Sequence, residues 1–198
     1  RIYRAVTEEH RDYIDHEASV PPAFAKVFRE NYQYAEKVAK IATWEEYQIN
    51  VDDGNNQNAF KEDAVFAEPD FFDIMTFPLV VDTGTRTLAE PNTAYISEDM
   101  AKKMYGTLDA LGKTFLFDNK ETIEVIGVLK NSPKTSLITE GIFISFPTLE
   151  KFNDFSGLET WSGISTDLQC FALLHPNQNI AEIENVLLEL PKEHRPNS

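Results

Sequence analysis

The stretch from Pro91 to Pro133 constrains the fold more than any other part of the chain, because its residue pattern changes from helical to extended within a short distance. Thr93–Ile96 is typical of a short strand, and Ser97 is a suitable N-cap because its hydroxyl can accept a hydrogen bond from a free amide of the first helical turn. Apolar residues then recur at helical spacing as far as Tyr105, and Gly106 is a suitable stop. The pattern predicts a strand that leads directly into a short helix.

Beyond this helix the residues follow the period of strands. Phe115 and Phe117 are separated by one residue, Asp118–Lys120 favours a turn, and the apolar, β-branched run 123–129 follows. The whole stretch therefore predicts a strand, a helix and a tight hairpin. It contains no obvious catalytic group.

These segments also resemble a known family. The series "AYISEDMAKKMYG", "ALGKTFLF" and "IEVIGVLKNSP" is similar to the extracytoplasmic core domain of MacB/FtsX-type ABC transporter permeases. The similarity extends upstream to "PPAFAKVFRENY" and "FAEPDFFDIMTFPL" and downstream to "GIFISFPTLEKF" and "FALLHP", so it covers nearly the whole chain in the family's order. Each motif alone is weak, whereas the ordered series is specific.

The expected fold is α+β with two lobes. The resemblance implies that residues 1–89 and 167–198 form a porter-like α/β sandwich lobe, and that residues 90–166 form an inserted, mixed α+β lobe. We expect each lobe to have its own core, with Ile126 and Val128 buried in the inserted lobe.

The division also predicts how individual elements pack. The strand Leu168–Leu174 should pair within the first lobe rather than with Ile142–Phe146. The helix Ile180–Leu190, which we expect Pro191 to interrupt, should pack beside the helix Ala23–Asn31 on one face of a shared sheet.

The resemblance further implies a non-catalytic module on the extracytoplasmic (periplasmic) side of the cell inner membrane. It implies a permease that dimerises with a second permease copy and pairs with a cytoplasmic ATPase, and it leaves room for a periplasmic adaptor protein. ATP hydrolysis would move the external domains, so the catalytic residues would belong to the ATPase. The chain starts abruptly at Arg1, as an excised piece would, and we expect the missing transmembrane helices to tether it to the membrane.

Charge and composition exclude several classes of function. The 198 residues carry a formal net charge of −15, which argues against nucleic-acid binding because phosphates are bound by Lys and Arg. No apolar run approaches the length of a transmembrane helix. The single cysteine, Cys170, excludes an internal disulfide, and its apolar neighbours predict a buried, inert thiol.

No motif predicts a catalytic, cofactor or metal site. The G-x-S-x-G, P-loop, H-E-x-x-H and dinucleotide-binding patterns are missing. One polar segment contains side chains at loose metal-ligand spacing: His10, Asp12, Asp15 and His16. We interpret residues 8–19 as a solvated connecting loop instead, and Asp52–Asn56 as a hairpin tip rather than a calcium loop.

Two further features have ordinary structural interpretations. The carboxylate pairs Glu45–Glu46 and Glu62–Asp63 lie in polar surroundings, so they favour solvated faces over acid–base chemistry. The apolar residues of Phe71–Phe77 could form an exposed docking patch, but they favour core beneath a short helix.

Two functional alternatives remain open at this point. A freestanding acidic binding or scaffold domain would recruit a basic partner, and a carboxylate-based hydrolase would need a pocket with two carboxylates of different pKa. Hydrophobic segments that flank this region in the encoding reading frame would favour the permease.

Overall fold

The computed structural model of the chain describes residues 2–4, 8–10, 13–15, 20–52, 57–82, 84, 86–133, 135–152, 159–161 and 167–194. The strands within these ranges are β1 (Ile2–Arg4), β2 (Glu8–His10), β3 (Tyr13–Asp15), β4 (Ala35–Asp52), β5 (Gln57–Ala67), β6 (Leu79–Asp82), β7 (Thr93–Ser97), β8 (Thr114–Phe117), β9 (Glu121–Leu129), β10 (Ile142–Ser145) and β11 (Leu168–Leu174). The helices are α1 (Phe24–Asn31), α2 (Phe71–Ile74), α3 (Glu98–Tyr105), α4 (Phe146–Leu149) and α5 (Ile180–His194). The predicted α+β class is confirmed.

Nine of these strands form one mixed sheet. Its order is β1-β11-β4-β5-β10-β7-β9-β6, and β8 pairs with both β4 and β9. The pairs β5–β10 and β7–β9 are parallel, and the other pairs of this sheet are antiparallel. β11 pairs with β4 and β1, which confirms that Leu168–Leu174 joins the strands predicted for the first lobe.

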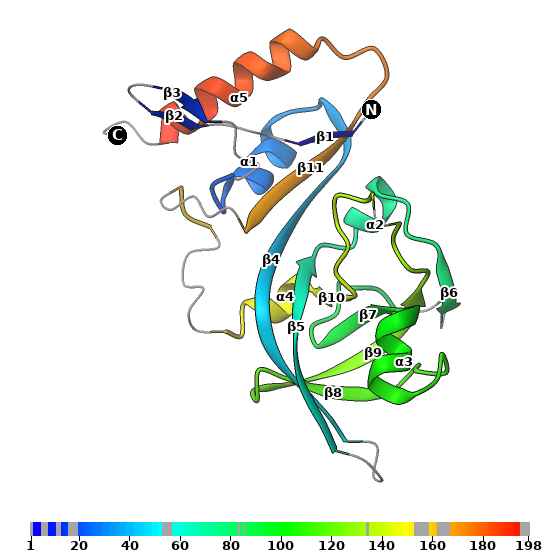
Figure 1. Cartoon of the computed structure of the whole chain (residues 1–198). Helices are drawn as coiled ribbons and strands as arrows, with labels where there is room; N and C mark the ends of the chain where they lie inside the picture. The colour runs from blue at the N-terminus through cyan, green and yellow to red at the C-terminus, as the bar shows by residue number, and fades with distance from the viewer. Residues whose placement is uncertain are drawn as a thin grey trace.

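The 18-residue strand β4 connects two groups of elements (Figure 1). The first group consists of α1, α5, β1 and β11 beside the first half of β4. The second consists of α2, α3 and β6–β10, which lie on the β5 side of β4, and its strand β8 pairs with the second half of β4. A β-bulge separates the halves, because the register with β5 shifts between Trp44 and Tyr47. Glu46 has a positive φ of 61° there, and its amide donates to Asp63 Oδ1 at 2.9 Å. Such bulges bend a strand, so β4 changes direction where it passes between the groups.

The N-cap and the C-terminal stop of α3 and the turn of the β8–β9 hairpin occur where the sequence predicts them. Ser97 Oγ accepts a hydrogen bond from the Met100 amide at 3.2 Å, and Gly106 ends α3 with a φ of 70°. In the hairpin, Asp118 and Asn119 have φ values of 49° and 54°, as a type I′ turn requires. The predicted cap, stop and turn are confirmed.

The first group has a core that α1, α5 and two strands share. Its largest buried members from the helices are Phe24, Phe28, Ile183 and Leu190, and they pack with Val38 of β4 and Cys170 of β11. The two helices therefore cover one face of the sheet, as the sequence predicts.

The expectation of separate cores for the two predicted lobes is wrong. Ile126 packs in one cluster with Ile41 and Phe171, and Val128 packs in another with Ile49. The reason is strand pairing across the predicted boundary, since β10 pairs with β5, β8 with β4, and β9 with β6. The division at residues 89 and 90 itself stays a prediction.

Two local expectations also differ from the structure. Within residues 8–19, Glu8–His10 and Tyr13–Asp15 pair as an antiparallel hairpin rather than forming a loop throughout. Pro191 does not interrupt the last helix, which continues to His194. Leu190, directly before the proline, is buried in the core shared with α1, and this packing offsets the lost hydrogen bond and the steric clash that a proline brings into a helix.

Candidate functional site

The structure provides no metal centre within its described ranges, where no group of three or more His, Cys, Asp or Glu side chains is placed to hold an ion. His10 and Asp15 belong to the β2–β3 hairpin, in which His10 pairs with Tyr13 and Asp15 with Glu8. Asp12 and His16 lie outside the described residues.

Three members of the two carboxylate pairs, Glu46, Glu62 and Asp63, contact a cation or a backbone amide. Glu62 forms an ion pair with Lys103, whose ammonium also lies 4.4 Å from the centroid of the Phe60 ring. Glu46 pairs with Lys61 at 3.1 Å, and Asp63 bonds to the backbone at the bulge. These contacts support the interpretation as solvated, structural faces. The hairpin interpretation of Asp52–Asn56 is also supported, since Asp52 pairs with Gln57, although residues 53–56 lie outside the described part.

Cys170 and the Phe71–Phe77 segment have the structural roles that the sequence predicts. Cys170 is buried, and burial raises the pKa of its thiol to about 12, so little reactive thiolate forms at neutral pH. Phe71 and Ile74 of α2 are buried, and the Phe71 ring lies 5.5 Å from that of Phe171 and 6.4 Å from that of Phe143.

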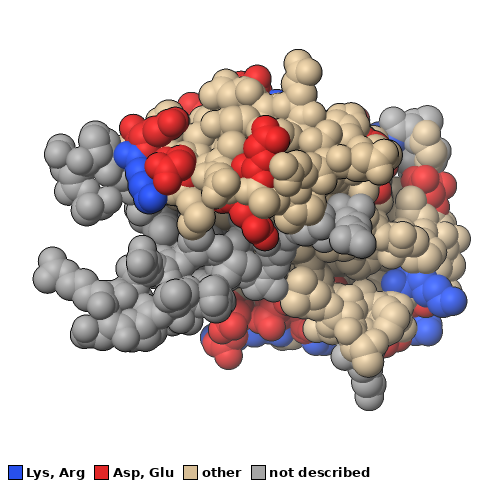
Figure 2. Space-filling view, turned by 90° about the horizontal axis from the view of Figure 1, so that it is seen from above, with Lys and Arg blue, Asp and Glu red and all other residues tan. Residues whose placement is uncertain are grey.

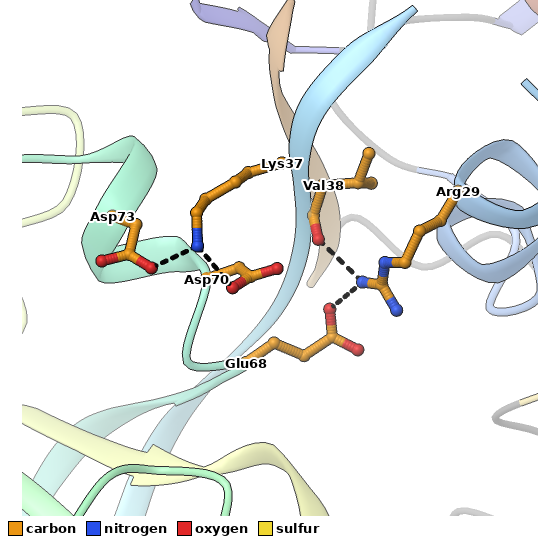
Figure 3. Close-up of polar contacts among 6 residues, drawn as sticks. All are labelled: Arg29, Lys37, Val38, Glu68, Asp70 and Asp73. Atoms are coloured by element: carbon orange, nitrogen blue, oxygen red, sulfur yellow. Dashed lines mark hydrogen bonds and ion pairs between the residues drawn. The ribbon is translucent and has the colours of Figure 1, made fainter. Parts of the chain in front are cut away.

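The first candidate functional feature is a polar cluster where the two groups of elements meet, which we call the β4 junction (Figure 3). It is made of the six residues drawn in Figure 3, which are Arg29, Lys37, Val38, Glu68, Asp70 and Asp73, together with Lys40. These residues come from α1, from β4, and from α2 with the short segment that joins it to β5. The cluster thus connects the neighbouring elements α1 and β4 to a segment that begins 39 positions beyond Arg29.

Glu68 is central to the β4 junction. Its Oε2 atom accepts from Arg29 Nη2 at 2.6 Å and from the Lys40 amide at 3.0 Å. The same Arg29 nitrogen donates to the Val38 carbonyl at 2.7 Å. The Glu68 side chain is only 18% exposed, so this charge-assisted bonding is less screened than an ordinary surface pair.

Two lysines flank this pair on β4. Lys37 Nζ donates to Asp73 at 2.6 Å and to Asp70 at 3.1 Å, and these hydrogen bonds raise the pKa of Lys37. Lys40 Nζ lies 4.4 Å from the centroid of the Phe146 ring. Burial lowers the pKa of Lys40, and the negative charge of Glu68 opposes that effect.

The β4 junction has no feature of an acid–base site, and its arrangement suits a mechanical connection. Arg29 of α1 is bound to Glu68 directly, and α2 is bound to β4 through Lys37. No sequence pattern predicts this cluster, because Arg29 and Glu68 are 39 positions apart and only the strand order brings them together.

The second candidate feature is an apolar hollow of about 460 Å³ in the second group, formed by the residues that follow α2 and those that follow β9. It is lined by Met75, Thr76, Phe77, Pro78, Lys130, Asn131, Ser132, Pro133, Ser136, Leu137 and Ile138. Leu137 is 62% exposed, and the chain continues from Pro78 into the exposed residues Leu79 and Val80 of β6. No sequence motif marks this hollow, because two segments about fifty residues apart form it.

The surface elsewhere is dominated by negative charge. Figure 2 shows carboxylates distributed over the face seen from above, with few Lys and Arg side chains among them. The helix α5, which lies at that end of the molecule in Figure 1, contributes the exposed residues Glu182, Glu184, Glu189 and Glu193. None of the helices in the described part of the chain combines the length and apolar character needed to cross a bilayer.

A family model and several solved structures match the chain. The model for the MacB-like periplasmic core domain matches residues 3–190. A domain assigned to a permease protein from Porphyromonas gingivalis has a TM-score of 0.73 at 22% identity, and the match covers 89% of this chain and 78% of that one. No curated protein matches the chain in sequence.

Two transporter domains have similar folds. The periplasmic region of MacB from Actinobacillus actinomycetemcomitans has a TM-score of 0.68 at 16% identity, with 97% of this chain and 81% of that chain covered. The extracellular domain of the noncanonic ABC-type transporter YknZ from Gram-positive bacteria has a TM-score of 0.64 at 14% identity, with 91% and 86% covered. At these identities the likeness concerns the fold.

Proposed function

The chain belongs to the family of MacB-like periplasmic core domains, and we propose that it couples ATP hydrolysis by a cytoplasmic ATPase to a conformational change outside the inner membrane. In this role the chain is a non-catalytic part of an ABC transporter permease. The observation that carries the proposal is the family match, which spans residues 3–190 of a 198-residue chain. The family is one of periplasmic permease domains rather than of enzymes.

The proposed partners follow from this assignment. A second permease copy and a cytoplasmic ATPase would complete the transporter, and a periplasmic adaptor protein would receive the movement or the cargo. Helices outside this chain would anchor it in the inner membrane. The acidic surface fits a domain that stays clear of anionic lipid headgroups, since like charges repel.

The architecture supports a mechanical role. Both groups of elements are hydrogen-bonded to the one continuous strand β4, so displacement of one group is resisted by the ladders of the other. The β4 junction adds side-chain bonds across the same strand through Arg29, Glu68 and Lys37. We propose that the Trp44–Tyr47 bulge is where the two groups change their angle, because a bulge is the irregular point of an otherwise regular ladder.

The assignment to the extracytoplasmic side is tested by cysteine labelling of the full-length protein. Leu188→Cys introduces an exposed thiol, whereas the native Cys170 is buried and serves as the internal control. We expect a membrane-impermeant maleimide to label L188C in intact spheroplasts. Labelling that requires cell lysis would place the domain in the cytoplasm, and the freestanding acidic scaffold would then be the better function.

The coupling is tested on the reconstituted permease and ATPase. Lys102 on α3 and Leu188 on α5 are both exposed and belong to different groups of elements. Dyes attached to K102C and L188C should show a change in energy transfer when ATP is added. With an ATPase variant that cannot hydrolyse ATP, the energy transfer should not cycle repeatedly between its two values. Energy transfer that does not depend on ATP would refute the coupling.

A further inference from the structure

The exposed apolar residues of the described chain are concentrated at one place. Of its four exposed large hydrophobic side chains, Leu79, Val80 and Leu137 adjoin the apolar hollow, and only Leu188 lies elsewhere. Isolated exposed apolar residues are ordinary, whereas a cluster beside a hollow is typical of an interaction surface. We call the hollow together with Leu79 and Val80 the apolar corner.

We propose that the apolar corner is a docking surface for a partner protein that presents an apolar side chain beside a carboxylate. The inference deepens the proposed function and rests on it for the place where that partner is found.

Charge at the apolar corner differs from that of the rest of the chain. The chain contains 33 Asp and Glu residues, yet no carboxylate is among the described residues that line the hollow, and Lys130 is their one charged side chain. Lys130 is exposed and has no ion pair within the described ranges. Glu98 bonds to the Asn131 amide at 3.3 Å without lining the hollow. An approaching carboxylate therefore meets a cation at the hollow and no carboxylate among the described residues that line it.

The shape of the apolar corner favours a protein over a small molecule. A small ligand is usually bound in a pocket that covers most of its surface. Here Leu137, which lines the hollow, is 62% exposed, and the adjoining residues Val80 and Leu79 are 46% and 40% exposed, so the apolar corner is open rather than enclosed. Projecting side chains bury their surface only against a partner that has complementary depressions of its own.

The position of β6 indicates contact through side chains rather than strand addition. β6 lies at the edge of the described sheet, but it is four residues long and its pairing with β9 shifts register between Leu79 and Val81. A short, bulged edge is a poor template for another strand. The bulge includes Val80, which is one of the exposed apolar side chains.

A second copy of the chain is a less suitable partner. Two copies would each bring a net charge of −15, and their mutual repulsion opposes association. A two-fold symmetric contact at this corner would also bring two copies of Lys130 toward each other without supplying a carboxylate from the lining. The observations therefore point to a different protein.

The proposal is tested by titrating the purified chain with synthetic peptides while following its backbone amide signals by NMR. Three ten-residue peptides of Gly and Ser carry Leu-Asp-Phe, Leu-Lys-Phe or Ser-Asp-Ser at the centre. At about 1 mM, where weak single-segment contacts become visible, the Leu-Asp-Phe peptide should shift the signals of Lys130–Ile138 and the other two should shift them less. Lys130→Glu should reverse the preference toward Leu-Lys-Phe.

Leu137→Asp and Leu188→Asp form a matched pair, because each places a carboxylate at an exposed leucine. L137D should weaken peptide binding roughly tenfold or more at an unchanged Tm, and L188D should leave both binding and Tm unchanged.

Three results would overturn the proposal. The first is that no peptide binds at the corner, or that L137D leaves binding unaltered. The second is self-association that L137D abolishes, which would make the partner a second copy. The third is decanoate bound there in preference to all peptides, which would indicate a lipid site. Each of these leaves the cysteine-labelling test of the permease assignment unaffected, so the two failures are distinguishable.

Discussion

The ring of Tyr95 lies over Gly127 on the neighbouring parallel strand, so closely that a Cβ atom at position 127 would be 2.8 Å from Tyr95 Cδ1. Leu79 Cδ2 approaches the same point to 2.9 Å. The glycine thus allows an aromatic side chain of β7 and a leucine of β6 to pack directly on the backbone of β9. This contact holds the edge strand that carries the apolar corner.

Replacing Gly127 with alanine should therefore destabilise the fold. We expect G127A to lower the free energy of unfolding by about 1–3 kcal/mol, as overpacking of a buried site does. Urea unfolding followed by circular dichroism measures the change. In a Tyr95→Leu background the alanine should cost less, and an equal cost in both backgrounds would mean that the ring is not the obstacle.

Breaking the Arg29–Glu68 contact should have unequal effects from its two sides. Glu68→Ala removes the acceptor for both Arg29 and the Lys40 amide, so we expect it to cost about 1–3 kcal/mol. Arg29→Ala should cost less, about 1 kcal/mol, because Glu68 keeps the Lys40 amide as a hydrogen-bond donor. Lys26→Ala, which breaks an exposed ion pair with Glu159, is the control and should not change the unfolding midpoint. An R29A effect larger than that of E68A would contradict the geometry.

Core substitutions should couple according to cluster rather than to lobe. Ile126 shares a cluster with Phe171, whereas Phe28 belongs to another. Ile126→Ala should cost about 2–5 kcal/mol. Its effect should add to that of Phe28→Ala and should be non-additive with Phe171→Ala. Double-mutant cycles in urea measure both pairs, and additivity of both would restore separate cores.

The thiol of Cys170 should make stability depend on pH in the alkaline range. Burial raises its pKa from an ordinary value of 9.0 to about 12, so the native state keeps the proton that the unfolded state loses. The contribution of the protonated thiol to the free energy of unfolding is fully present below pH 9.0, and it is lost as the pH rises from there toward 12. The difference in unfolding free energy between wild type and Cys170→Ala should therefore change in favour of the variant from pH 8 to pH 10. A constant difference would show that the thiol titrates alike in both states.

The sequence predicts the features that depend on neighbouring residues. The Ser97 cap, the Gly106 stop and the Asp118–Asn119 turn require only local chemistry, and each occurs as expected. The buried position of Phe71 follows in the same way from apolar spacing around α2.

Features that depend on strand order could not be predicted. The parallel pairing of Phe143 with Val65 places β10 next to β5, and no residue in either strand signals that choice. It brings Ile126 near Ile41 and makes the cores continuous across the predicted lobe boundary. The β4 junction and the apolar corner are likewise formed by segments that meet only after the sheet is assembled.

The position of β11 between β1 and β4 has a consequence for how the chain folds as it is made. β1 is residues 2–4 and β4 begins at residue 35, yet the strand that joins them is residues 168–174. A chain that emerges during synthesis can form the β4–β5 and β8–β9 hairpins early, because their contacts are local. β1 can pair only after residues 168–174 have left the ribosome or the translocation channel. β1 is therefore among the last strands to join the sheet, and it is the strand that a chaperone of nascent chains would have to shield for the longest time.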